Sequence, residues 1–158
     1  MKLDCRILLL LLPLGLSACA SSYGVSEAKA VAVPEISGQS LSLALSVARA
    51  TGRNVLVEYA DEDCSASRNM QHHALSDPRV KEQLKSVVYL RVMKGVNARD
   101  FEARFGQRAT PTIIVLRPDG TTPGSLVTGE IGTSDFLNYL AWARTTDGPE
   151  PGFTAGST

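Results

Sequence analysis

The chain has 158 residues, with 16 Lys and Arg against 16 Asp and Glu, so its formal net charge at pH 7 is zero. This length fits one domain with extensions and is enough to bury a hydrophobic core. The balanced charge and the aromatic content of 6% give no basic, aromatic-rich surface, so we expect no nucleic-acid partner.

The N-terminus has the pattern of an export signal. Lys2 and Arg6 form a short positive region, and residues 7–12 form an apolar run too short to span ~30 Å of hydrocarbon. The sequence Leu16-Ser17-Ala18-Cys19 follows and resembles the lipobox of bacterial lipoproteins. That resemblance implies a signal peptide over residues 1–18 and a lipid on Cys19.

The alternative is an ordinary secretory signal with a chance cysteine near the cleavage site. The order of charge, apolar core and box favours the lipoprotein. Ala20 follows the cysteine in place of the Asp that tends to retain lipoproteins at the inner membrane. We therefore expect a lipid-anchored protein of the bacterial cell envelope, at the outer membrane and facing the periplasm. Residues 19–36 are expected to be a flexible tether, and residues 146–158 a disordered tail.

Between these ends, over residues 37–145, helical and strand patterns alternate. Apolar residues at helical spacing, short β-forming runs and turn residues predict the following elements. In chain order they are a helix from Leu41 ending at Gly52, a strand at 55–57, a helix at 64–75, a helix begun by Asp77-Pro78, a strand at 87–92, a helix capped by Asn97, a strand at 112–116, a strand at 125–130 and a helix capped by Ser134. This order predicts an α/β sandwich with a mixed central sheet and flanking helices.

Several short motifs stand in one register along this domain. They are the strand 55–57, the acid Glu58, Cys64, Met70, Ser76-Asp77-Pro78, Ala109-Thr110-Pro111-Thr112 and Arg117-Pro118-Asp119-Gly120. Together they resemble the thioredoxin-like fold family, in particular its periplasmic subgroup, over residues 41–144. The resemblance implies that Cys64 is the nucleophilic cysteine, that Glu58 is the buried acid and that Thr110-Pro111 is the cis-proline loop.

Two positions depart from the family pattern. Ser67 replaces the second cysteine of the Cys-x-x-Cys motif, and Asp63 replaces the aromatic residue before the first cysteine, within the acidic loop 61–63. Since Cys5 leaves with the signal peptide and Cys19 is lipidated, Cys64 has no partner thiol in its own chain. The start of a helix lowers a cysteine pKa, whereas the acidic loop opposes that effect.

Roles for the site residues follow from the resemblance. Ser67 cannot resolve a mixed disulfide, but its hydroxyl can donate a hydrogen bond to the Cys64 thiolate. Glu58 is either a proton carrier for the thiol or a satisfied polar residue at a strand end. Thr110 and Pro111 either bind an extended substrate peptide or only close a turn, and we favour substrate binding.

Other chemistries fit less well. His72 lies ~12 Å along a helix from Cys64, too far to share one ion, so we expect no metal site, and no cofactor is implied. A peroxiredoxin would have Thr at position 61, where this chain has Asp61. A Cys–His hydrolase needs a base near Cys64 that the sequence does not place.

Two functions remain. The first is monothiol thiol–disulfide exchange through Cys64 with protein disulfides or glutathione-like thiols. The alternative is a redox-inactive thioredoxin-fold module that binds a partner at the outer membrane, with the acidic loop as the candidate contact.

Overall fold

The computed structural model describes residues 36–37 and 40–152. Its sheet contains five strands, in the order β1-β3-β2-β4-β5. Their bounds are β1 Ile36–Ser37, β2 Val55–Ala60, β3 Val88–Met93, β4 Thr112–Leu116 and β5 Val127–Thr128. Strands β1, β2 and β3 pair in parallel, whereas β4 is antiparallel to both β2 and β5. The sheet is therefore mixed, as predicted.

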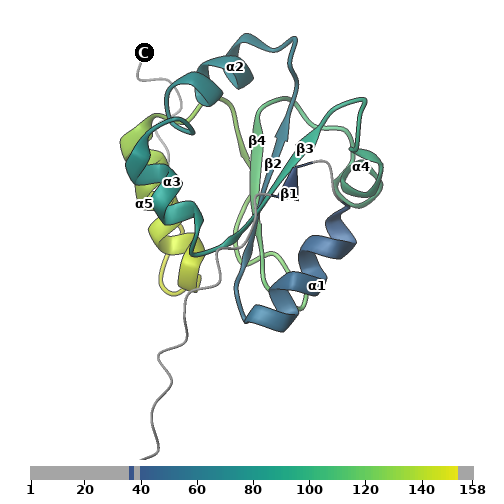
Figure 1. The fold of residues 1–158 in the computed structure, drawn as a ribbon, viewed down its shortest axis with the longest axis vertical. Coiled ribbons are helices and arrows are strands. Elements are labelled where there is room, and N and C mark those ends of the chain that lie inside the picture. The colour runs from purple at the N-terminus through teal and green to yellow at the C-terminus, as the bar shows by residue number, and fades with distance from the viewer. Residues whose placement is uncertain (1–35, 38–39, 153–158) are drawn as a thin grey trace, which may run out of the picture. The chain divides into compact units, whose positions relative to one another are not determined.

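Five helices cover the two faces of the sheet in the described residues (Figure 1). They are α1 Leu41–Thr51, α2 Ser65–His72, α3 Pro78–Leu84, α4 Arg99–Phe105 and α5 Thr133–Thr145. Helices α1 and α4 lie on one side of the sheet, and α2, α3 and α5 lie on the other. The predicted order of elements is confirmed, and β1 is an additional edge strand that begins within the predicted tether.

Alternation along the strands divides the core into two clusters, one on each face of the sheet. On β2, Val55 and Val57 pack with α1 and α4, whereas Leu56 packs with Met70 of α2 and with α3 and α5. Glu58 follows Leu56 by two residues and therefore points toward the α2, α3 and α5 face. This parity decides on which side of the sheet the buried acid lies.

Local sequence signals explain most helix ends. Asp77 accepts a hydrogen bond from the Arg79 N–H at 2.8 Å, with Pro78 as the first helical residue, so the predicted start of α3 is confirmed. Gly52 ends α1 with a φ of 68°, a left-handed conformation that glycine adopts without strain. Met70 and Trp142 are both buried, in the core cluster on the α2, α3 and α5 side of the sheet.

Three local predictions are wrong. The helix expected over 64–75 ends at His72, because the Leu75 N–H turns back to the Met70 carbonyl. Asn97 does not cap α4, since its Oδ1 accepts a hydrogen bond from the Met93 N–H at 2.6 Å and closes the turn after β3. Helix α5 begins after Gly132, so Ser134 lies inside its first turn.

The predicted ends of the chain are described only in part. The signal peptide, Cys19 and most of the tether lie outside the described residues, so those predictions remain predictions. Of the predicted tail, residues 146–152 are described, and the Glu150 carboxylate accepts a hydrogen bond from the Ser125 N–H at 2.9 Å. No helix in the described part of the chain is both long enough and apolar enough to span a bilayer.

Candidate active site

Cys64 lies at the junction of β2 and α2. The loop after β2 turns at Asp61, whose carbonyl accepts from the Cys64 N–H at 3.1 Å, and Cys64 is the residue immediately before α2. Its side chain is half-buried. The thiol is therefore accessible while it lies over the free N–H groups of the first helical turn.

Hydrogen-bond donors around the thiol favour its charged form. The Ser67 backbone N–H is the main cause that lowers the pKa of Cys64 below the usual cysteine value. The Thr110 and Ser67 hydroxyls and the Ala66 N–H act in the same direction, while partial burial opposes them. The carboxylates of the acidic loop 61–63, which were expected to raise the pKa of Cys64, are not among the causes of the shift. Cys64 is thus better placed for thiolate chemistry than a free cysteine.

Ser67 fills the position of the missing second cysteine and is 1% exposed. Its Oγ accepts a hydrogen bond from the Asp61 N–H at 3.3 Å, which fixes the hydroxyl between the loop and the thiol. The hydroxyl proton then remains for donation toward Cys64. A serine at this position can stabilise the Cys64 thiolate but cannot form a disulfide with Cys64.

The loop around Pro111 supplies the other wall of the site. The Thr110–Pro111 peptide bond is cis, and the Cys64 thiol donates to the Thr110 carbonyl at 3.1 Å. The Pro111 carbonyl accepts from the Gly129 N–H at 2.8 Å, which joins the loop to the residue after β5. Cys64 and Thr110 are 46 residues apart in the sequence. The fold therefore brings Cys64 against the Thr110–Pro111 loop.

Glu58 is fully buried on β2, six residues before Cys64 in the sequence. The Tyr89 hydroxyl donates to its Oε2, and the Arg91 Nε lies 3.5 Å from the same oxygen. Both partners come from β3, in which Arg91 stands directly opposite Glu58. A buried carboxylate needs such donors, since an isolated one would be strongly destabilising.

Sequence reasoning missed Tyr89 and Arg91. A signal was present, because residues two apart on a strand share a face and Arg91 interrupts an apolar strand. The pairing register of β2 with β3 was needed to recognise it.

A hollow of about 480 Å³ beside the site is lined by Ser67, Arg91 and the loop Asp61–Asp63, among others. It therefore adjoins residues that contact Cys64 and residues that contact Glu58.

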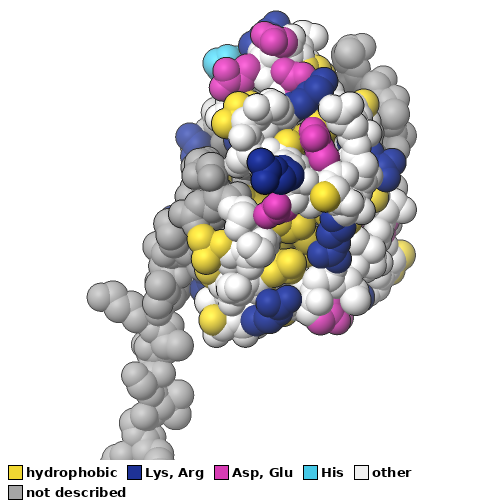
Figure 2. Space-filling view, turned by 90° about the vertical axis from the view of Figure 1, so that its right-hand side faces the viewer, with side chains coloured by type: hydrophobic (Ala, Val, Ile, Leu, Met, Phe, Trp, Pro, Cys, Tyr) yellow, Lys and Arg dark blue, Asp and Glu magenta, His cyan; other side chains and the backbone are white. Residues whose placement is uncertain are grey.

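Acidic side chains gather at the end of the molecule where β2 runs into α2 (Figure 2). Asp61 pairs with Lys94 at 3.3 Å, and Arg68 donates to the Glu62 carbonyl at 2.7 Å, so basic residues hold the loop in place. Across the described residues, no group of three or more His, Cys, Asp and Glu side chains is arranged to hold a metal ion.

Residues 41–143 match the family described as the thioredoxin-like domain. The chain belongs to this family. It is also 31% identical over 106 residues to the thiol:disulfide interchange protein DsbD of Pseudomonas fluorescens. That match covers 65% of this chain but only 18% of the relative, so it concerns a small part of a much longer protein.

Solved structures agree on the thioredoxin-like fold. A thioredoxin from Thermus thermophilus is 24% identical, with a TM-score of 0.59 over 72% of this chain and 90% of its own. The C-terminal domain of Neisseria meningitidis DsbD in its oxidised form is 16% identical, with a TM-score of 0.56 over 65% of this chain and 91% of its own. The thioredoxin-like fold expected from the motifs is therefore confirmed.

Proposed function

We propose that this thioredoxin-like protein performs monothiol thiol–disulfide exchange through Cys64. The observation that carries the proposal is the setting of the thiol, which has Ser67 donors on one side and the Thr110–Pro111 loop on the other. Membership of the thioredoxin-like family supports the same chemistry. The substrates are protein disulfides or small disulfides such as oxidised glutathione.

The reaction requires no cofactor. The Cys64 thiolate attacks one sulfur of the substrate disulfide, the substrate S–S bond breaks, and the second sulfur leaves as a thiolate that takes a proton from water. The product is a mixed disulfide on Cys64, with no net oxidation or reduction. Since Ser67 has no thiol to displace the substrate, a thiol from another molecule must attack the mixed disulfide and release it.

Other site residues take supporting roles in this scheme. Thr110 and Pro111 form the edge along which an extended substrate chain lies. Once Cys64 is deprotonated it no longer donates to the Thr110 carbonyl, which leaves this acceptor available to the substrate backbone. Glu58 exchanges a proton with the site as the thiol reacts, and Tyr89 and Arg91 hold its carboxylate in place.

We also propose that the domain is anchored by a lipid on Cys19 and faces the periplasm from the outer membrane. The support is the lipobox Leu16–Cys19 and the absence of Asp at position 20. In a bacterium that processes lipoproteins, labelled palmitate should be incorporated into the wild-type protein and not into Cys19→Ala. Recovery of the wild-type protein with the inner-membrane fraction would contradict the outer-membrane location.

Incubation of the purified protein with oxidised glutathione tests the exchange reaction. Intact-mass measurement should show one glutathione per chain on Cys64, removed by a small thiol, and no adduct on Cys64→Ser. The same variant provides the control for folding, since a Ser at this half-buried position should leave the circular dichroism spectrum unchanged.

The alternative function is a redox-inactive binding module, favoured by Ser67 and by the exposed acids Glu62 and Asp63. It predicts that Cys64 resists alkylation in the folded protein at neutral pH. It also predicts that Cys64→Ser keeps the cellular phenotype, whereas replacing the acidic loop 61–63 by amides destroys it. These outcomes are opposite to those of the exchange reaction, so one set of variants separates the two functions.

A further inference from the structure

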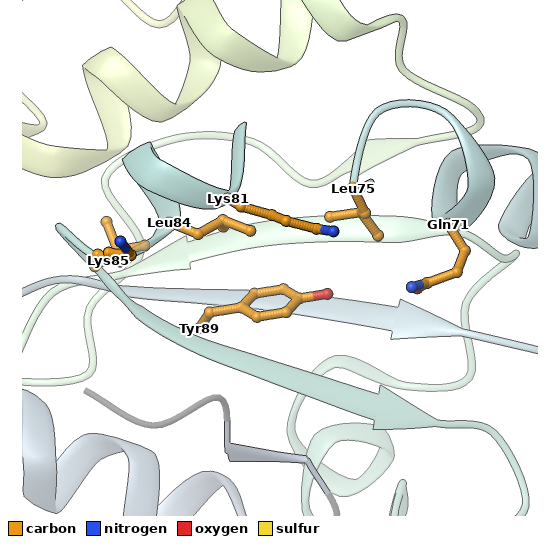
Figure 3. Close-up of a pocket in the computed structure, with 7 residues that line it drawn as sticks. Gln71, Leu75, Lys81, Leu84, Lys85 and Tyr89 are labelled. Carbon is orange, nitrogen blue, oxygen red and sulfur yellow. The ribbon is translucent and has the colours of Figure 1, made fainter. Parts of the chain in front are cut away.

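A pocket of about 280 Å³ lies between β3, α3 and the end of α2, apart from Cys64 (Figure 3). Its walls come from Gln71, Leu75, Lys81, Leu84 and Tyr89, together with two neighbours on the α3–β3 connection. Ligand pockets are typically ~300–1,000 Å³, so this volume suits a small molecule. Apart from Tyr89, whose hydroxyl donates to Glu58, none of the residues that line this pocket has a role in the proposed exchange reaction.

The floor of the pocket is apolar. Leu75, Val87 and Tyr89 are 5%, 1% and 9% exposed, and Leu84 is partly buried against the same core cluster. The Tyr89 ring lies along the floor, with its hydroxyl end toward Gln71 (Figure 3). A rigid aromatic and aliphatic floor of this kind favours an apolar group of a ligand.

The charged residues that line the pocket are both cationic. Lys85 already has a partner, since its Nζ lies 2.5 Å from the Glu82 carboxylate. Lys81 has no carboxylate within 4.0 Å among residues 40–152. In Figure 3 its side chain extends along the pocket, above the Tyr89 ring and toward Leu75. Within the described residues, the pocket therefore combines an apolar floor with one lysine at its rim that has no carboxylate partner.

We propose that this pocket binds a small carboxylate with an apolar tail. The carboxylate pairs with the Lys81 ammonium and accepts a hydrogen bond from the Gln71 amide, and the tail covers the Tyr89 ring. One unpaired lysine matches a monoanion, and the apolar floor excludes a fully polar anion such as free phosphate.

Octanoate is a suitable probe for this site on the full chain. Isothermal titration should give saturable binding, and amide NMR shifts should concentrate on Leu75, Leu84 and Tyr89. Octanoate should bind at least about tenfold more tightly than butanoate, because each buried methylene contributes up to about fourfold in affinity. Octanamide, which has the same tail without the charge, should bind about two- to fivefold more weakly than octanoate.

Two variants with the same loss of one charge locate the carboxylate. Lys81→Gln should weaken octanoate binding by about two- to fivefold, because Lys81 is exposed and an exposed ion pair contributes up to about 1 kcal/mol. Arg49→Gln, at an exposed position of α1 on the other side of the sheet, should leave it unchanged. Both positions are exposed, so both variants should keep the wild-type melting temperature.

Three results would overturn the proposal. One is equal affinity for octanoate and octanamide, which would mean a neutral apolar occupant. Another is equal loss in the two variants, which would mean attraction by overall charge. The last is a shift of the pocket resonances with protein concentration alone, which would mean that a second copy of the chain covers the pocket.

Discussion

The burial of Glu58 predicts a large loss of unfolding free energy when its hydrogen bond from Tyr89 is removed. Tyr89→Phe removes the hydroxyl that donates to Glu58 Oε2 and leaves the ring in place. Glu58 is 0% exposed, so water cannot replace the lost donor, and Arg91 Nε at 3.5 Å remains on the same oxygen. Leaving a buried acceptor without its donor costs about 1–3 kcal/mol, so we expect the free energy of unfolding to fall by about 2 kcal/mol.

Tyr59→Phe is the matched control. Its hydroxyl also donates to a carboxylate, Glu102 Oε1, at 2.6 Å, and its ring is also buried. The difference is that Glu102 is only half-buried, so water can take the place of the phenol. We expect this variant to lose less than about 1 kcal/mol.

Urea denaturation followed by circular dichroism measures both variants. Tyr89→Phe should shift the midpoint clearly more than Tyr59→Phe with an unchanged slope. In a thermal scan, about 2 kcal/mol corresponds to a fall of roughly 8 °C in Tm for a domain of this size. Equal losses in the two variants, or a loss below about 0.5 kcal/mol for Tyr89→Phe, would refute the reasoning that burial of Glu58 determines the cost.

Three other variants test separate parts of the account. Ser67→Ala keeps the Ser67 backbone N–H, the main cause of the lowered pKa of Cys64, and removes only the smaller contribution of the hydroxyl. It should raise the pKa of Cys64 and slow its alkylation by iodoacetamide by up to about fivefold at neutral pH, with no slowing at high pH, where the thiolate is fully formed. Asp77, whose pKa is lowered to about 2 first by its side-chain hydrogen bond from Arg79, should contribute stability that is lost as pH falls from about 4 through that value. Asp77→Asn should therefore flatten this part of the stability–pH curve, and an unchanged slope would contradict the assignment. Leu56→Ala, at a fully buried position of β2, should cost about 2–5 kcal/mol in urea denaturation.

The order of elements could be predicted because each has a local signal. Asp77-Pro78 begins α3 and Gly52 ends α1 through their own backbone preferences. Asn97 shows where such reasoning fails. Its side chain has two competing uses, and in the structure it accepts from the Met93 N–H in the turn after β3 and makes no cap to α4. The outcome depends on the three-dimensional path of the chain, which one local pattern does not contain.

Only the site residues that belong to the family's short motifs could be predicted from the sequence. Cys64 and Thr110 were each assigned to the site through the resemblance, and in the structure the Cys64 sulfur lies 3.1 Å from the Thr110 carbonyl oxygen. Tyr89 and Arg91 were missed because their meaning depends on the register of β3 against β2, which tertiary packing sets. The lowered pKa of Cys64 was also uncertain from sequence, since charge counting gives no weight to the Ser67 N–H.

The central claim is that Cys64 forms mixed disulfides that the chain cannot resolve. The most direct measurement follows the glutathione adduct by intact mass after excess oxidised glutathione has been removed. For the wild-type protein the adduct should persist until a small thiol is added, whereas Ser67→Cys should lose it spontaneously and gain an internal disulfide. Failure of the wild-type adduct to form, or its spontaneous loss at the rate of Ser67→Cys, would contradict the claim.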